Sequence, residues 1–227
     1  ARVQWQNYAT VWMNEEASML RAFANTLYIA LFSIVGQMLI SSLAAYSFAK
    51  INFKGKQVVF MLFLSSMMVP SQLTIIPRFM LFKTIGLYNN LWAIILPAFF
   101  GATSIFMLRQ FYMGLPNDLI EAAKIDGAGH LRIFLRIMLP LTKAALMSLI
   151  ILAFISSWNE YMAPLIFLVK KELYTVSQNI QWYMLDEFKE HNLTMAAATS
   201  AIVPVVILFI VGQKYFVEGI ATSCVKG

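Results

Sequence analysis

The chain is poor in cysteine, histidine and charge. Cys224 is the single cysteine among 227 residues, which excludes an internal disulfide and a cysteine metal site. The two histidines, His130 and His191, lie far apart and have no neighbours of ligand type, so we interpret both as surface or loop residues and expect no metal. The sequence also lacks a GxxxxGK(S/T) nucleotide-binding loop and a nucleophile elbow. We therefore expect no catalytic residues, no cofactor bound by this chain and no ATPase activity of its own.

Long uncharged runs are abundant instead. Charged residues make up 12% of the chain and hydrophobic residues 60%, whereas a soluble domain has roughly 25% charged residues. Five apolar runs are near or above the roughly 20 residues that a helix needs to cross about 30 Å of hydrocarbon. The predicted spans are residues 23–49, 58–76, 91–108, 144–169 and 193–216. The sequence therefore predicts an all-α, multi-pass integral membrane protein.

The basic residues give the predicted orientation. If residue 1 is outside, the inner side holds ten basic and four acidic residues and the outer side holds seven of each, so the whole net charge of +6 is inside. We predict an outer amphipathic approach at 1–22, a transmembrane domain at 23–217 and a cytoplasmic tail at 218–227. Because residues 1–20 do not resemble a secretory signal and Ala1 is not an initiator Met, we expect a sixth span before residue 1.

A polar segment, residues 115–141, separates the third span from the fourth and is predicted to be cytoplasmic. Asn117 or Asp118 can cap a short helix, and Asp118 with Glu121 has the spacing of a capping box. Gly127 and Gly129 are predicted to end that helix. Ala122 and Ala123, between the capping carboxylate and the glycine turn, are small enough for a partner to approach the backbone.

A second helix is predicted to follow and to end at Pro140. One face carries two arginines, Arg132 and Arg136, and another carries an apolar stripe of Leu131, Phe134, Leu135 and Met138. We interpret the segment as a docking knob for a protein partner. The alternative is an amphipathic helix pair that lies on anionic lipid headgroups.

Proline and polar residues interrupt two of the predicted spans, the second and the fourth. Pro70 removes a backbone donor within the second span, close to Gln72, and the freed carbonyls must face protein or a wet cavity. Asn159, Glu160 and Tyr161 interrupt the fourth span, where an ionisable residue is costly. We take Gln72, Asn159, Glu160 and Tyr161 as candidates for a translocation pathway. The alternatives are an ordinary kink at Pro70 and, for Glu160, a hydrated carboxylate that caps a broken helix.

Several motifs resemble one family. The pattern Glu121-Ala122-Ala123, then Asp126-Gly127-Ala128, then Phe134, Ile137 and Leu139-Pro140 is similar to the cytoplasmic EAA loop of ABC importer permeases. Stretches similar to the carbohydrate branch are AYSFA at 45–49, LRQF at 108–111, SWNEY at 157–161 and VKG at 225–227. Among two-permease sugar importers the chain most resembles the smaller, second maltose-type permease. Cys224 stands where that family commonly has a small residue such as alanine.

The resemblance implies a type I ABC importer permease fold and an ATP-driven, binding-protein-dependent sugar or oligosaccharide importer in a bacterial or archaeal plasma membrane. The implied partners are a homologous second permease, two ATPase subunits that carry ATP and Mg, and an external solute-binding protein that meets the outer loop 170–192; no nucleic acid is expected. Residues implied to couple to the ATPase are Glu121, Ala122, Ala123, Asp126, Gly127, Arg132 and Arg136, and the implied ATPase-contacting tail is Val225, Lys226 and Gly227.

Three alternatives stand beside this interpretation. One is a permease of the same fold for another solute, such as a glycerol phosphodiester or an acidic oligosaccharide. A second is an intramembrane enzyme, although Glu160 is the one conspicuous acid in the apolar runs and has no evident partner. A third is a structural or lipid-interacting membrane protein. The scarcity of fixed charge in the spans favours neutral sugars over charged solutes.

Overall fold

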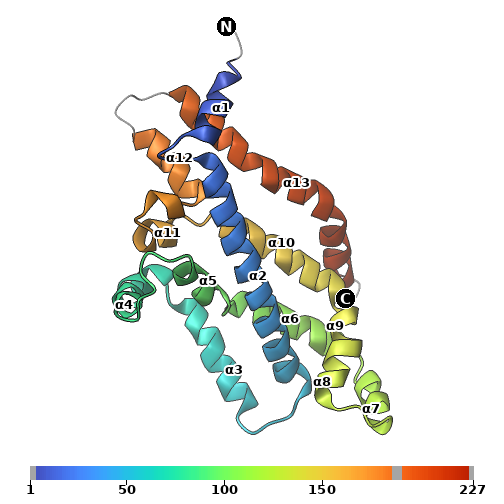
Figure 1. Cartoon of the computed structure of the whole chain (residues 1–227). Helices are drawn as coiled ribbons and strands as arrows, with labels where there is room; N and C mark the ends of the chain where they lie inside the picture. The colour runs from blue at the N-terminus through green and yellow to red at the C-terminus, as the bar shows by residue number, and fades with distance from the viewer. Residues whose placement is uncertain (1–3, 186–190, 225–227) are drawn as a thin grey trace. The chain divides into compact units, whose positions relative to one another are not determined.

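The computed structural model describes residues 4–185 and 191–224, and every regular element among them is helical (Figure 1). The chain divides into two compact units, which we call the first and the second unit. The first unit comprises Ala1–Ser33, Thr74–Pro97 and Leu152–Val211, and the second comprises Ile34–Leu73, Ala98–Ile151 and Gly212–Gly227. Three long helices, α2 (Met19–Lys50), α10 (Lys143–Trp158) and α13 (His191–Cys224), therefore contribute residues to both units.

The first unit contains the amino-terminal helix and parts of all five predicted spans. Its elements are α1 (Gln6–Met13), the start of α2, most of α4 (Ser71–Thr84), α5 (Trp92–Ala98), the end of α10, α11 (Met162–Phe167), η3 (Lys171–Leu173), α12 (Val176–Leu185) and α13 (His191–Cys224) as far as Val211. A cluster of buried side chains that includes Val11, Met19, Trp158 and Tyr183 forms its main core.

The second unit contains the polar segment predicted to dock a partner. Its elements are the rest of α2, α3 (Lys56–Ser65), η1 (Ser66–Met68), α6 (Ala102–Gly114), α7 (Asp118–Ile125), α8 (His130–Ile133), η2 (Phe134–Met138), α9 (Leu139–Leu141) and the first part of α10. Its core is built from α2, α6 and the polar segment, with Tyr46, Leu108, Tyr112 and Met138 buried. Gly36 allows α2 to pack closely here, because a Cβ atom at this position would overlap the ring of Phe99.

The prediction of an all-α membrane protein is confirmed. Three helical stretches of the described residues are long and apolar enough to cross a membrane: Met19–Lys50, Trp92–Gly114 and His191–Gln213. Two pairs of helices reach that length only together, and each is sharply bent: Lys56–Met68 with Ser71–Thr84, at 96°, and His130–Leu141 with Lys143–Trp158, at 77°. The number of spans rises to five if each bent pair is one span.

The bent pairs correct the second and fourth predicted spans. Pro70 does not lie inside a continuous helix, because η1 ends at Met68 and α4 begins at Ser71; the break coincides with the proline, which restricts the residue before it to extended backbone. Pro77, expected just beyond the second span, lies inside α4. The fourth predicted span also stops early, since α10 ends at Trp158 and α11 is a separate short helix.

The predicted outer loop 170–192 is largely helical in its described part, because it contains η3 and α12. Polar residues that look like loop residues in the sequence are buried here. The Gln178 amide donates to the carbonyls of Pro164 and Leu168, at 3.1 Å each, and the Asn179 amide donates to the carbonyl of Ala17 at 3.0 Å. These bonds join residues that are 10 to 162 positions apart, so no local sequence pattern predicts them.

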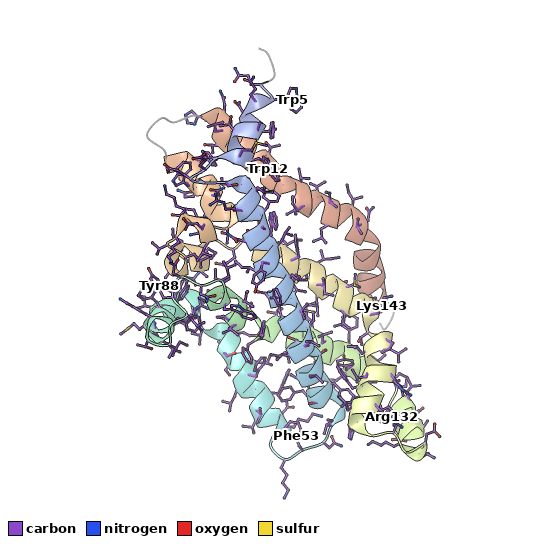
Figure 2. The ribbon with its side chains drawn as sticks, in the orientation of Figure 1. Trp5, Trp12, Phe53, Tyr88, Arg132 and Lys143 are labelled. Atoms are coloured by element: carbon purple, nitrogen blue, oxygen red, sulfur yellow. The ribbon has the colours of Figure 1, made fainter. Side chains whose placement is uncertain are left out.

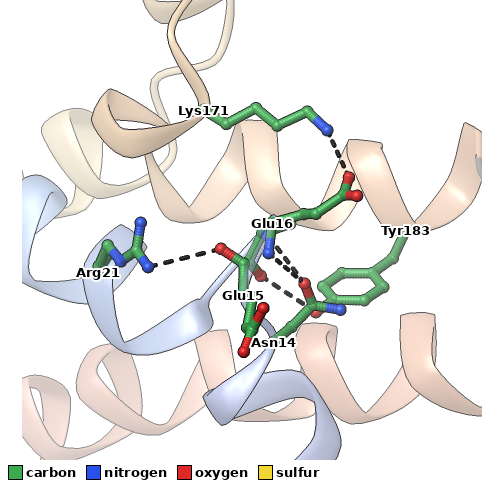
Figure 3. Close-up of polar contacts among 7 residues, drawn as sticks. Asn14, Glu15, Glu16, Arg21, Lys171 and Tyr183 are labelled. Carbon is green, nitrogen blue, oxygen red and sulfur yellow. Dashed lines mark hydrogen bonds and ion pairs between the residues drawn. The ribbon is translucent and has the colours of Figure 1, made fainter.

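The amino-terminal segment is bonded into the first unit. Glu16 forms an ion pair of 2.6 Å with Lys171 (Figure 3). The Tyr183 hydroxyl donates to the carbonyl of Ala17, and the indole of Trp12 donates to the Ser200 hydroxyl. Val11 is fully buried, whereas Trp5 is exposed. The segment predicted as an outer amphipathic approach is therefore a packed part of this unit.

Candidate coupling segment

Residues 115–141, which we call the coupling segment, form two short helical pieces joined by a glycine turn. In the first piece, α7, Ile120 and Ala123 are buried against the core of the second unit. All other positions of α7 are exposed, and helical spacing places four of them on one face: Asp118, Glu121, Ala122 and Ile125. Ile125 is 86% exposed, which is unusual for an isoleucine and marks this face as one without cover in the chain itself.

The predicted capping box is not formed. Asn117 precedes α7, but its side chain makes no capping bond to the helix. Its Oδ1 instead accepts a hydrogen bond of 2.6 Å from Nζ of Lys50. An ammonium donor competes successfully for this oxygen because a charge-assisted bond is stronger than a neutral one. The carboxylates of Asp118 and Glu121 stay at the amino end of α7, where the helix dipole favours negative charge.

The predicted glycine turn is confirmed at Gly127. Its φ of +77° lies in the left-handed region that favours glycine. The Gly127 amide donates to the carbonyl of Lys124 at 3.0 Å and the Ala128 amide to that of Ala123 at 2.9 Å, which is the Schellman pattern of helix termination. Gly129, in contrast, has extended backbone with φ −74°. Of the two glycines, Gly127 is the one that the turn requires.

The second piece of the coupling segment differs from the predicted helix. It runs from α8 through the π-helical turn η2 into α9, so Pro140 does not end it. Proline is tolerated at the second position of α9 because a helix start needs no backbone donor there. The piece ends at Thr142, whose hydroxyl donates to the carbonyl of Met138 at 3.0 Å, and α10 begins at the next residue.

The predicted apolar stripe is half wrong. Phe134 and Met138 are buried as expected, but Leu131 and Leu135 are 66% and 52% exposed. The π turn changes the spacing of the buried positions, because i and i+5 then share a face: Ile133 and Met138 are both fully buried. A stripe drawn with ordinary α-helical spacing misplaces the two leucines.

The exposed leucines line a groove together with both predicted arginines. It has a volume of about 430 Å³ and is lined by Gly127, Gly129, Leu131, Arg132, Leu135 and Arg136. Figure 2 shows Arg132 on this part of the segment. Within the described residues, neither arginine forms an ion pair with an acidic side chain. The groove therefore offers apolar surface and two unneutralised guanidinium groups to whatever covers it.

All seven predicted coupling residues of the segment lie in the second unit, and all but Ala123 are at its surface. Gly127, Arg132 and Arg136 line the groove, and Glu121, Ala122 and Asp126 are exposed on α7 or at its end. Ala123 is 8% exposed and packs in the core, so it offers almost no surface to a partner. The tail residues Val225, Lys226 and Gly227 lie outside the described residues.

Sequence reasoning missed the residues that hold the segment in place. The side chain of Lys50 bonds the chain just before α7, and the Tyr46 hydroxyl lies 3.0 Å from Nδ1 of His130, the first residue of α8. His130 is exposed, as its interpretation as a surface residue requires, yet it has this specific partner. The AYSFA motif at 45–49 contains Tyr46 and was the available signal, but nothing in the sequence names its partner.

The predicted pathway residues belong to both units. Gln72 is an exposed residue of the second unit, whereas Asn159, Glu160 and Tyr161 belong to the first. Glu160 Oε1 accepts a 3.0 Å hydrogen bond from the amide of Ala163, which supports the alternative of a carboxylate that caps the broken helix. The Asn159 amide donates to the carbonyl of Ile155 at 2.9 Å. A role in the pathway remains a prediction for all four.

An all-α membrane chain with an EAA-type segment between two apolar spans has the architecture of a transport permease. The family model described as "Binding-protein-dependent transport system inner membrane component" matches residues 37–222, and the chain belongs to this family. The prediction of a carbohydrate ABC importer permease is confirmed at this level.

Individual relatives agree with the family. The chain is 35% identical over 225 residues to the arabinooligosaccharides transport system permease protein AraQ of Bacillus subtilis, covering 99% of this chain and 80% of the relative. It is 31% identical over 225 residues to the sn-glycerol-3-phosphate transport system permease protein UgpE of Yersinia enterocolitica, covering 96% and 80%. A chain of a bacterial ABC transporter involved in the import of the acidic polysaccharide alginate has the same fold, with a TM-score of 0.84, 24% identity and coverage of 95% and 81%.

Proposed function

We propose that this chain is the membrane translocation subunit of an ATP-driven, binding-protein-dependent importer of sugars or oligosaccharides. In this proposal the coupling segment docks on an ATPase subunit and passes its motion to the membrane helices. The observation that carries the proposal is the uncovered surface of the segment: the exposed face of α7, with Glu121, Ala122 and Ile125, and the neighbouring groove with Arg132 and Arg136.

The surface has the chemistry of a protein-docking site. Ile125 and the two groove leucines supply apolar area, and the small side chain of Ala122 allows close approach of a partner. The acids of α7 and the arginines of the groove supply charges of both signs at separate places, which favours one orientation of the partner. Such a surface fits a partner with a hydrophobic cleft that is flanked by complementary charges.

The backbone supplies a route for motion. The second piece of the coupling segment leads through Thr142 directly into α10, with a bend of 77° between them. A displacement of the docked segment would therefore act on the start of α10. When the two ATPase subunits close around ATP and Mg, the coupling segments of this chain and of a homologous second permease would approach each other and move the spans between inward-open and outward-open states. Each state needs its own stabilising contacts, because otherwise closure of the ATPase subunits would not shift the equilibrium between the inward-open and outward-open states.

The proposed solute is a neutral sugar or oligosaccharide, delivered from outside by a solute-binding protein. The arabinooligosaccharide relative supports this class, and the low content of fixed charge in the spans agrees with it. The glycerol-3-phosphate relative and the alginate transporter keep the anionic solutes as the second candidate. Uptake of a labelled arabinooligosaccharide and of labelled glycerol 3-phosphate, each with its matching binding protein, separates the two.

The docking proposal is tested in the assembled transporter. We expect Glu121→Ala to lower solute uptake and to weaken retention of the ATPase subunits during purification, while the amount of chain inserted in the membrane stays unchanged. Glu15→Ala is the matched control, because Glu15 is an equally exposed acid in the first unit, outside the coupling segment. Unchanged uptake and ATPase retention in Glu121→Ala, together with unchanged uptake in Gly127→Pro, would refute the docking role.

A further inference from the structure

The carboxyl-terminal turns of α2 contact the coupling segment on both sides of α7. Lys50, the last residue of α2, donates from Nζ to the carbonyl of Leu115 at 2.7 Å and to Oδ1 of Asn117 at 2.6 Å. Both acceptors lie immediately before α7. This bonding explains why the Asn117 side chain does not cap its own helix.

The second contact lies one helical turn earlier on α2 and reaches the other side of α7. The Tyr46 hydroxyl is 3.0 Å from Nδ1 of His130 and donates to it when His130 carries its proton on Nε2. The ring of Tyr46 is only 3% exposed and packs against Tyr112 and Phe134, with ring centroids 6.1 and 5.4 Å away. The buried ring fixes the hydroxyl in place, so that it can hold the exposed His130.

A third bond fixes the same end of α2 to its neighbours. Nε of Arg109 on α6 donates to the carbonyl of Phe48 at 3.3 Å, and the guanidinium group lies 4.1 Å from the centre of the Phe60 ring on α3. The end of α2 is therefore held by α6 while it bonds the coupling segment. All of these contacts lie within the second unit.

We propose that Tyr46 and Lys50 are positioning residues that form a two-point clamp between α2 and the coupling segment. This inference rests on the proposed function. Ile120 and Ala123 pack α7 against the core, and the bonds before and after α7 fix both of its ends. Motion of the docked segment is then transmitted to α2 through the clamp as well as to α10 through the backbone.

The clamp is tested with two substitutions that each remove one polar group and with a third that keeps it. Tyr46→Phe removes only the hydroxyl, Asn117→Leu removes one acceptor of Lys50, and Asn117→Asp keeps an oxygen acceptor at the same place. Tyr28→Phe is the matched control, because Tyr28 is a tyrosine of the same helix that lies in the first unit and whose hydroxyl forms no hydrogen bond within the described part of the chain. The whole transporter, with its ATPase subunits, is reconstituted in liposomes for each variant.

The measured quantity is the number of ATP molecules hydrolysed per labelled arabinooligosaccharide taken up, together with the amount of assembled complex. Mutations that disturb coupling change the coupling free energy by roughly 0.5–2 kcal/mol. We therefore expect the ratio of ATP hydrolysed to solute taken up to rise about 2- to 30-fold in Tyr46→Phe and in Asn117→Leu. Asn117→Asp and Tyr28→Phe should keep the ratio of the unsubstituted transporter. Combining Tyr46→Phe with His130→Leu should add nothing to the effect of either alone, because both break the same bond.

A second measurement does not depend on the solute. Spin labels at Leu43 on α2 and at Leu119 on α7, both exposed and outside the docking surface, report one distance within the second unit after Cys224→Ser has removed the native thiol. We expect a single distance that persists when the complex is trapped with ATP and vanadate, and the loss of that single distance in the clamp variants. Unchanged distances and ratios in Tyr46→Phe and Asn117→Leu would overturn the clamp. If Glu121→Ala also left ATPase retention and uptake intact, the docking proposal itself would fail.

Discussion

The left-handed turn at Gly127 gives the sharpest prediction about the coupling segment. Gly127 and Gly129 both line the groove, and a Cβ atom added at either would meet nothing within 4 Å. The two positions differ in backbone conformation, with φ of +77° at Gly127 and −74° at Gly129. Gly127→Ala and Gly129→Ala are therefore matched substitutions that add the same methyl group to the same groove and differ chiefly in strain.

The magnitude follows from the conformation. An L-residue with a Cβ atom pays roughly 1–2 kcal/mol in the left-handed region, while alanine with extended backbone pays none. If the free segment relaxes this strain and the docked segment must restore it, docking loses up to the same free energy. Because a loss of about 1.4 kcal/mol of binding free energy raises a dissociation constant tenfold, the dissociation constant should rise by about 5- to 30-fold for Gly127→Ala. Asparagine tolerates the left-handed region, so Gly127→Asn should lie between alanine and the unsubstituted chain.

The assay is binding of the purified ATPase subunit to the permease pair in nanodiscs, measured as a dissociation constant. Gly129→Ala should stay within twofold of the unsubstituted chain, since surface substitutions away from special features usually change free energies by less than about 0.5 kcal/mol. Equal dissociation constants for Gly127→Ala and Gly129→Ala would refute the argument. If both are equally weakened relative to the unsubstituted chain, the methyl groups obstruct the partner and the turn conformation does not matter.

Two predictions concern the first unit. Gln178→Leu removes a buried amide that donates to two carbonyls. We expect the solubilised protein to lose about 1–3 kcal/mol of unfolding free energy, measured by thermal or denaturant unfolding. Gln181→Leu is the control and should cost less, because Gln181 is half-buried and its side chain forms no hydrogen bond within the described residues. The hydrogen bond from Lys171 lowers the pKa of Glu16 from its ordinary value of 4.5. The exposed ion pair should therefore contribute its small stabilisation above pH 4.5 and lose it as the pH falls below that value. Glu16→Gln should abolish this pH dependence in unfolding measurements. An unchanged pH dependence in Glu16→Gln would show that the ion pair is not its cause.

The features that could be predicted from the sequence are those with a local cause. The apolar runs follow from composition, and the Gly127 turn follows from the conformational freedom of one residue. The features that were missed depend on distant partners. Asn117 fails to cap its helix because Lys50, 67 positions earlier, takes its oxygen, and α12 looks like a loop because its polar side chains bond distant carbonyls. The π turn escapes prediction for another reason: its register is set by packing of Ile133 and Met138 in the core.

The surface of the coupling segment also bears on the alternative that it lies on anionic headgroups. Such a surface would favour basic and apolar residues on one common face. The groove with Arg132 and Arg136 meets this requirement, but α7 exposes two acids, Asp118 and Glu121, on the face of Ile125 and a single basic residue, Lys124, outside that face. Anionic lipid would repel these carboxylates. A folded partner can place basic groups against α7 and acidic groups against the arginines at the same time, so the charge pattern favours a protein partner over the membrane surface.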